Sequence, residues 1–112
     1  MTFEQACTLA LALPQTVEQD HHGIPSFRVR GKIFATAPDE AHLRVMVDEA
    51  EIRAATAEDP DAFEEFWWGS RLACVVVDLR RVATDQLAEL LDEAWRRKAP
   101  LRLVREHDGE AS

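Results

Sequence analysis

The run Leu-Ala-Cys-Val-Val-Val at residues 72–77 constrains the fold of this 112-residue chain more than any other segment. Six valine-rich residues are too few to cross a bilayer, which takes about 20, but they suit a β-strand. Apolar side chains would point to both faces of such a strand, so the pattern predicts an interior strand of a sheet that is covered on both faces. The chain must then supply neighbouring strands and covering helices within one domain.

The segment between Thr84 and Pro100 carries the clearest helical pattern. Its apolar residues recur at spacings of three and four positions, which places them on one face of a helix. Thr84 is predicted to cap this helix and Pro100 to end it, leaving a short helical tail. Trp95 is expected to lie in the core against Val75 and Val77. The apolar face consists of Leu87, Leu90, Leu91, Ala94 and Trp95.

Turn and capping residues divide the rest of the chain into shorter elements. Thr2 and Gln5 predict a capping box at the start of a first helix. Gly31 and Lys32 are predicted as a hairpin turn with a positive φ at Gly31, and residues 20–25 are predicted as a loop. The expected elements are a helix at 2–13, strands at 26–30, 33–36 and 42–46, a helix at 49–58, and a strand at 63–67.

This order of elements predicts an α+β fold with the arrangement α-β(3)-α-β(2)-α, in which a mostly antiparallel sheet packs against helices. The length suits a single domain with one core. We expect that domain to span residues 1–107 and residues 108–112 to form a flexible tail.

Charge and composition limit the classes of function. The net charge of −8 opposes broad attraction to nucleic acid or an anionic membrane, because phosphate binding depends on Lys and Arg. The chain has no apolar run long enough to span a membrane and no signal-peptide pattern, so we expect a cytoplasmic protein without membrane association. Cys7 and Cys74 lie in apolar segments, where unpaired thiols behave as small hydrophobic residues.

Residues that could perform chemistry are scattered along the chain. His21 and His22 are adjacent, a spacing that rarely serves one metal ion, so solvated loop histidines are favoured over a metal site. Ser26 and Ser70 lack the G-x-S-x-G setting of a nucleophile, and the four glycines form no phosphate loop. We therefore expect a protein that is not an enzyme and holds no cofactor or metal; an active site built from scattered residues is the alternative.

Basic residues concentrate at a few places. Arg28 and Arg30 are predicted on one face of a strand. Arg71 flanks a turn beside Trp67 and Trp68, and cations beside aromatic rings are typical of nucleic-acid sites. The alternative is that these charges keep a hairpin soluble and complement the dipole of the last helix. The candidate nucleic-acid contacts are Arg28, Arg30, Lys32, Arg71, Arg96, Arg97, Lys98 and Arg102.

Three stretches stand out as a set: P-S-F-R-V-R-G-K-I-F at residues 25–34, Val-Asp-Leu at 77–79 and Ala-Trp-Arg at 94–96. With weaker matches between them, they resemble the MmcQ/YjbR family of small bacterial proteins over nearly the whole chain. The resemblance implies a fold similar to secretion chaperones and a DNA-binding role for two projecting hairpin wings. The first wing would hold Arg28, Arg30, Gly31 and Lys32, and the second would centre on Trp67, Trp68, Gly69 and Arg71.

Three hypotheses of function follow. The first is a non-enzymatic DNA-binding or regulatory protein that uses the basic residues. The second is a protein-interaction module of the same fold, in which Trp67 and Trp68 anchor another protein. The third is an enzyme with a cleft near His21 and His22. The sequence predicts neither a target nor an oligomeric state.

Overall fold

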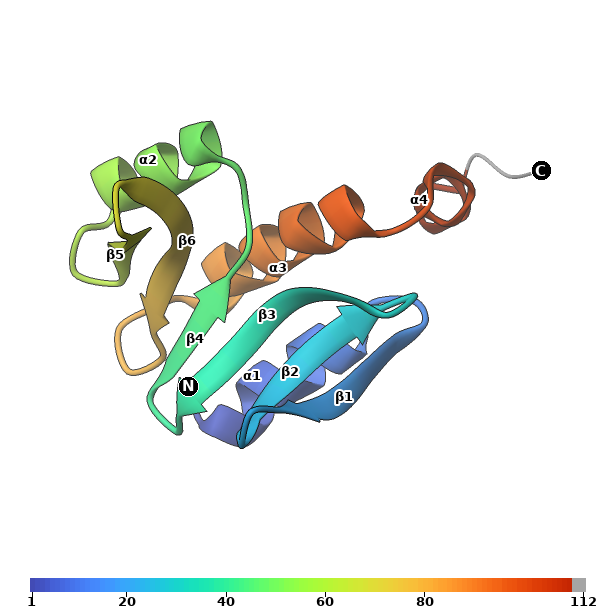
Figure 1. The fold of residues 1–112 in the computed structure, drawn as a ribbon, viewed down its shortest axis with the longest axis horizontal. Helices are drawn as coiled ribbons and strands as arrows, with labels where there is room; N and C mark the ends of the chain where they lie inside the picture. The colour runs from blue at the N-terminus through green and yellow to red at the C-terminus, as the bar shows by residue number, and fades with distance from the viewer. Residues whose placement is uncertain (110–112) are drawn as a thin grey trace.

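The structure is a computed structural model that describes residues 1–109, and Figure 1 shows its elements. The α+β fold class is confirmed. Residues 110–112 of the predicted flexible tail lie outside the described residues. The helices are α1 (Phe3–Leu11), α2 (Glu49–Glu58), α3 (Thr84–Lys98) and α4 (Leu101–His107). The strands are β1 (Thr16–His21), β2 (Ile24–Val29), β3 (Lys32–Asp39), β4 (His42–Val45), β5 (Phe63–Trp68) and β6 (Arg71–Asp78).

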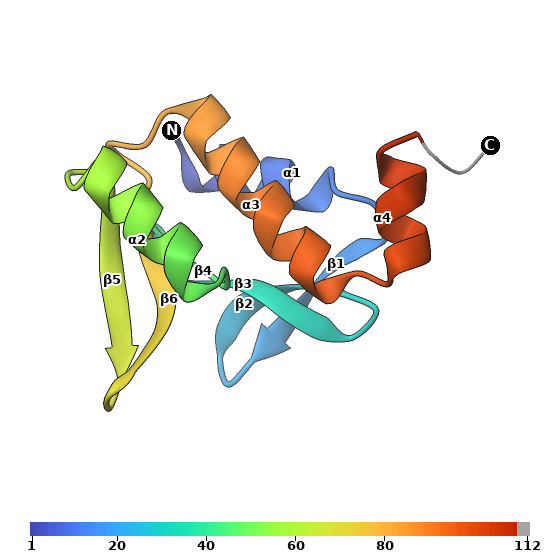
Figure 2. The same ribbon diagram turned by 90° about the horizontal axis from the view of Figure 1, so that it is seen from above.

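The six strands form one antiparallel sheet in the order β1-β2-β3-β4-β6-β5. Strands β4 and β6 pair although α2 and β5 separate them in sequence, so the two hairpin regions join at the middle of the sheet. Helix α2 packs on β5 and β6, whereas α3 packs on β3, β4 and α1. Figure 2 shows the β5–β6 hairpin and the β1–β2 turn projecting away from α1 and α3.

Strand β1 is an element that the sequence did not predict. Its residues pair along their whole length with β2. The segment 20–25 was predicted as a loop, but Asp20 and His21 lie in β1 and Ile24 and Pro25 lie in β2. Four of the six residues of β1 are exposed, so it shows no apolar alternation that would indicate a strand. Backbone pairing at the edge of the sheet stabilises β1, and that pairing leaves little signal in local sequence.

The β2–β3 turn lies one residue earlier than predicted. Its central residues are Arg30 and Gly31, with φ of 51° and 79°, and Lys32 already belongs to β3. A two-residue hairpin turn of this kind needs a positive φ at both positions, so glycine takes one position and Arg30 tolerates the other. The positive φ predicted for Gly31 is confirmed. The β1–β2 turn repeats the arrangement at His22 and Gly23.

The core lies between the helices and the sheet, and Trp95 is its largest fully buried side chain. The indole Nε1 of Trp95 donates a hydrogen bond to the carbonyl of Pro14 at 3.0 Å, which ties α3 to the connection between α1 and β1. Burial of Trp95 is therefore confirmed, and the main packing partners of α3 are β3, α1 and β4. Ala83 is the N-cap of α3, and Thr84, the predicted cap, is its first helical residue.

Strand β6 occupies the interior position that its apolar run predicted. Val75 and Val77 are fully buried on the core face, whereas Val76 on the other face is only half-buried. The predicted cover on both faces is therefore incomplete. On the second face the cover comes from neighbouring strands: Arg44, the partner of Val76, stacks on the ring of Phe66 at 4.8 Å.

Candidate functional site

Three of the predicted basic residues line one groove of about 450 Å³. Arg71 comes from the start of β6, and Arg97 and Lys98 come from the last turn of α3. The groove residues come from β1, β3, β6, the end of α3 and the segment from β4 into α2, elements that Figure 2 shows from above. The other lining residues are His21, Ile33, Thr36, Met46, Val47, Asp48, Glu49, Leu72 and Ala73.

The acidic side chains of the groove have hydrogen-bond or ion-pair partners, whereas two of its basic side chains have none within residues 1–109. Asp48 caps α2 by accepting a hydrogen bond from the backbone of Glu51, and Glu49 pairs with Arg53 at 2.9 Å. Both acidic residues of the lining therefore have partners. Within residues 1–109, neither Arg71 nor Lys98 makes a side-chain hydrogen bond or ion pair. The lining thus holds three cationic side chains against two carboxylates, a small local excess of positive charge although the chain as a whole is acidic.

Arg97 is positioned by the backbone of the opposite wall. Its Nη1 donates a hydrogen bond to the carbonyl of Met46 at 3.1 Å. This contact joins the end of α3 to the segment between β4 and α2. The guanidinium keeps its remaining donors, because a single carbonyl satisfies only one of its five N–H groups.

His21 also lines the groove, and it is the outer member of a set of polar contacts with Arg28 and Ser26. Arg28 donates from Nε to the hydroxyl of Ser26 at 3.0 Å, and its Nη2 lies 3.5 Å from Nδ1 of His21. Ser26 is fully buried and donates in turn to the carbonyl of Gln19. Arg28 is therefore half-buried and fixed in direction. His21 lies in β1, so the prediction of a loop position for it is wrong, whereas His22 lies in the exposed turn.

The structure separates the other predicted cations from this groove. Arg30 donates to the side chain of Gln15 at 2.6 Å, and with Arg102 it lines a different hollow beside α4. Since Arg30 lies in the turn and Arg28 within β2, the two do not form the predicted common face. Lys32 is exposed at the start of β3.

Arg96 is occupied by ion pairs at the C-terminal end. It donates to Asp92 at 2.6 Å and to both oxygens of Asp108, and these bonds raise the pKa of its guanidinium further. His107 lies 2.9 Å from Asp92 and packs edge-on against Trp95. These contacts hold α4 against α3, so the structure assigns Arg96 a structural role.

Two exposed tryptophans lie at the end of β5, the strand that pairs with β6. Trp68 at the end of β5 is 71% exposed and Trp67 is 46% exposed. Trp68 pairs directly with Arg71 across the hairpin, and such cross-strand partners lie with their Cβ atoms about 5 Å apart. The exposed indole therefore neighbours one of the groove cations.

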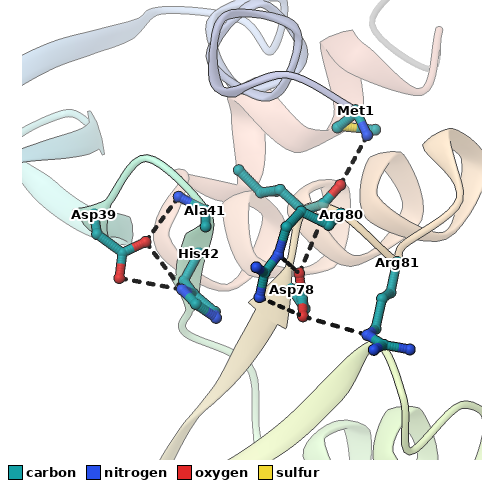
Figure 3. Close-up of polar contacts among 8 residues, drawn as sticks. Met1, Asp39, Ala41, His42, Asp78, Arg80 and Arg81 are labelled. Carbon is teal, nitrogen blue, oxygen red and sulfur yellow. Dashed lines mark hydrogen bonds and ion pairs between the residues drawn. The ribbon is translucent and has the colours of Figure 1, made fainter.

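A separate polar cluster lies at the opposite end of the sheet, where Figure 3 shows it. Asp39 accepts from the backbone of Ala41 and lies 2.9 Å from Nδ1 of His42, whereas Asp78 is bound by Arg80 and Arg81. Hydrogen bonds from His42 and from Arg80 lower the pKa of Asp39 and of Asp78 respectively. The acids are satisfied within the cluster, so it serves to fix the β3–β4 turn and the end of β6.

This cluster predicts a loss of stability in acid. The pKa of Asp78 is lower in the folded protein than its usual value of about 3.9, so its contribution is complete above that pH and is lost as the pH falls below it. The melting temperature of Asp78→Asn should therefore fall less steeply than that of the parent between about pH 4 and about pH 2. Asp61→Asn, which removes an exposed carboxylate without bonded partners in residues 1–109, should leave the steepness unchanged. Equal acid dependence in both variants would contradict the assignment.

The cysteines do not form a reactive site. Burial raises the pKa of both the Cys74 and the Cys7 thiol, and neither cysteine is in a disulfide.

Within residues 1–109 no group of three or more His, Cys, Asp or Glu could hold a metal ion. No helix in the same range combines the length and apolar character needed to cross a bilayer.

The family model described as YjbR matches residues 11–97, which is most of the chain. The chain belongs to the YjbR family. This YjbR-family protein also resembles the crystal structure of Deinococcus radiodurans protein DR2400, which contains the domain DUF419. The TM-score is 0.73 at 19% sequence identity, over 96% of this chain and 88% of the other, a likeness that establishes the fold. Among curated proteins, none matches this YjbR-family chain.

Several groove residues of this YjbR-family protein were not among the site residues predicted from the sequence. Thr36, Met46 and Asp48 line the groove, but they come from a strand, a connection and a helix cap that look structural in isolation. The pairing of β4 with β6 brings them beside Arg71. By contrast, the ion pair of Arg96 had a sequence signal, because Asp92 precedes it by four residues on the same helix.

Proposed function

We propose that this YjbR-family protein is a non-enzymatic protein that binds DNA in the groove lined by Arg71, Arg97 and Lys98. The observation that carries the proposal is the convergence of three cations on one groove that holds only two carboxylates, of which Glu49 is paired with Arg53 and Asp48 caps α2. Phosphate groups are the ligands that unpaired Arg and Lys bind most readily in nucleic acids.

The overall acidity of the chain sets the expected mode of binding. A net charge of −8 repels polyanions such as DNA. At physiological salt, dissolved ions screen this repulsion beyond about 8 to 10 Å. A local basic groove can therefore act only at short distance. We expect modest affinity that depends strongly on salt and that involves few phosphates.

The double variant Arg71→Ala with Lys98→Ala tests the groove. It removes up to two phosphate contacts and should reduce the magnitude of the slope of log K against log salt by up to about two for duplex DNA, and by slightly less for a single strand. Affinity is measured by fluorescence anisotropy of labelled oligonucleotides between about 50 and about 200 mM salt. The free energy of unfolding should stay within about 0.5 kcal/mol, because neither side chain has a bonded partner in residues 1–109.

A charge-matched control separates a local contact from a general change in charge. Arg102→Ala with Arg105→Ala removes the same charge from α4, which Figure 2 shows on the far side of the molecule from β5–β6. The salt slope of this control should match that of the parent. The groove assignment is wrong if both double variants change the slope equally, and the DNA proposal is wrong if the parent binds no DNA at low salt.

A protein-interaction role is the second candidate, and the exposure of Trp67 and Trp68 favours it. Aromatic anchors of this kind dominate many protein interfaces. Such binding would depend on apolar contact and would change little with salt, in contrast to binding led by phosphates. The same salt series therefore distinguishes the two candidates.

A further inference from the structure

We infer that the DNA bound by this groove is single-stranded and that Trp68 stacks on one of its unpaired bases, an inference that rests on the proposed function. The observation is the position of a highly exposed indole directly across the β5–β6 hairpin from one groove cation, Arg71. Trp68 is 71% exposed, more than any other large apolar side chain of residues 1–109. Its cross-strand partner is Arg71, which lines the groove.

The indole is free to accept a base. Within residues 1–109, the aromatic ring pairs are His21 with His22 and Trp95 with His107, and neither includes Trp68. Trp68 lies at the end of β5, where the β5–β6 hairpin projects from the molecule, as Figure 2 shows. The ring is therefore exposed without a stacking partner from the described part of the chain.

Stacking on Trp68 requires an unpaired base. In a duplex, neighbouring base pairs cover the faces of the bases, whereas a single strand can present a face to an aromatic ring. A phosphate on Arg71 would place an adjacent base within reach of Trp68, because the two side chains are cross-strand neighbours. Sites for single-stranded nucleic acid combine cations that bind the phosphate backbone with aromatic rings that stack on the bases.

The size of the groove agrees with this ligand. Its volume of about 450 Å³ lies within the range of about 300 to 1,000 Å³ typical of sites that enclose small ligands. A groove of this size can take one or a few nucleotides of a flexible strand, whereas a paired duplex could touch only its rim.

The test compares oligothymidylate of about 20 nucleotides, longer than a single-strand site of about 4 to 16, with a duplex of the same length at low salt. The parent should bind the single strand more tightly, and binding should quench tryptophan fluorescence, since Trp68 is exposed and Trp95 is buried. Trp68→Ala should weaken single-strand binding by about 5- to 150-fold without changing the salt slope. Trp68→Phe should retain most of the affinity, and Leu101→Ala, which removes another exposed apolar side chain, should retain all of it.

The outcomes separate the inference from the proposed function. If Trp68→Ala binds the single strand as tightly as the parent, or if the duplex binds as tightly as the single strand, the inference is overturned. The proposed function would still stand in either case, provided that Arg71→Ala with Lys98→Ala changes the salt slope. If the parent binds neither oligonucleotide at low salt, the proposed function fails and the inference fails with it.

Discussion

Replacing Trp95 with alanine should lower the free energy of unfolding by about 3 to 5 kcal/mol, the largest effect expected for a single substitution in this protein. Trp95 is fully buried, so the change removes the largest side chain of the core and leaves a cavity. It also leaves the carbonyl of Pro14 without its indole donor. A domain of this size has only about 5 to 15 kcal/mol of stability, so the variant should be close to unfolding.

Thermal and urea denaturation measure this effect. Trp95→Ala should lower the melting temperature by more than about 10 °C. Trp68→Ala is the matched control, because the same substitution at a 71% exposed position should change stability by no more than about 0.5 kcal/mol. If Trp95→Ala melted within a few degrees of the parent, the buried face assigned to α3 would be wrong.

Gly31→Val should destabilise the protein by about 2 kcal/mol, and the cause is the backbone. Gly31 has a φ of 79°, a conformation that β-branched residues adopt only with strain. A Cβ added at this position would meet no atom of residues 1–109 within 4 Å, so steric overlap with neighbours does not contribute. The effect therefore isolates the conformational demand of the β2–β3 turn.

Gly31→Asn provides the control for this prediction, because asparagine tolerates a positive φ better than other residues with a side chain. Its loss of stability, measured by urea denaturation, should be clearly smaller than that of Gly31→Val. Equal losses in the two variants would show that the side chain, and not the backbone conformation, causes the destabilisation. DNA binding should be retained in both folded variants, because the turn lies outside the proposed groove.

Elements with strong local patterns were predictable from sequence. The apolar run of β6 indicated an interior strand, and the periodicity of α3 placed Trp95 on a buried face; both predictions are confirmed. Strand β1 was missed because its exposed, polar residues are held by pairing with β2. The β2–β3 turn was shifted by one residue because a non-glycine residue, Arg30, occupies a positive φ.

The candidate site was only partly predictable. The sequence named Arg71, Arg97 and Lys98, but it gave them no advantage over the other cations. The structure brings these three to one groove and pairs Arg96 with Asp92 and Asp108 instead. Basic residues that look alike in the sequence differ in whether they can bind a ligand. The difference arises because an ion pair forms only where the fold places an acidic side chain within about 4 Å.

The sequence by itself determined which segments become helices and interior strands, because these depend on apolar periodicity and on capping and turn residues within a few positions. Only the tertiary structure decided which cations remain unpaired and which surfaces meet. The pairing of β4 with β6 brings Arg71 toward the end of α3, and α4 folds back so that Asp108 reaches Arg96. Both events join residues distant in sequence, and the free energy of such contacts comes from packing and backbone pairing across the whole sheet, which no local pattern records.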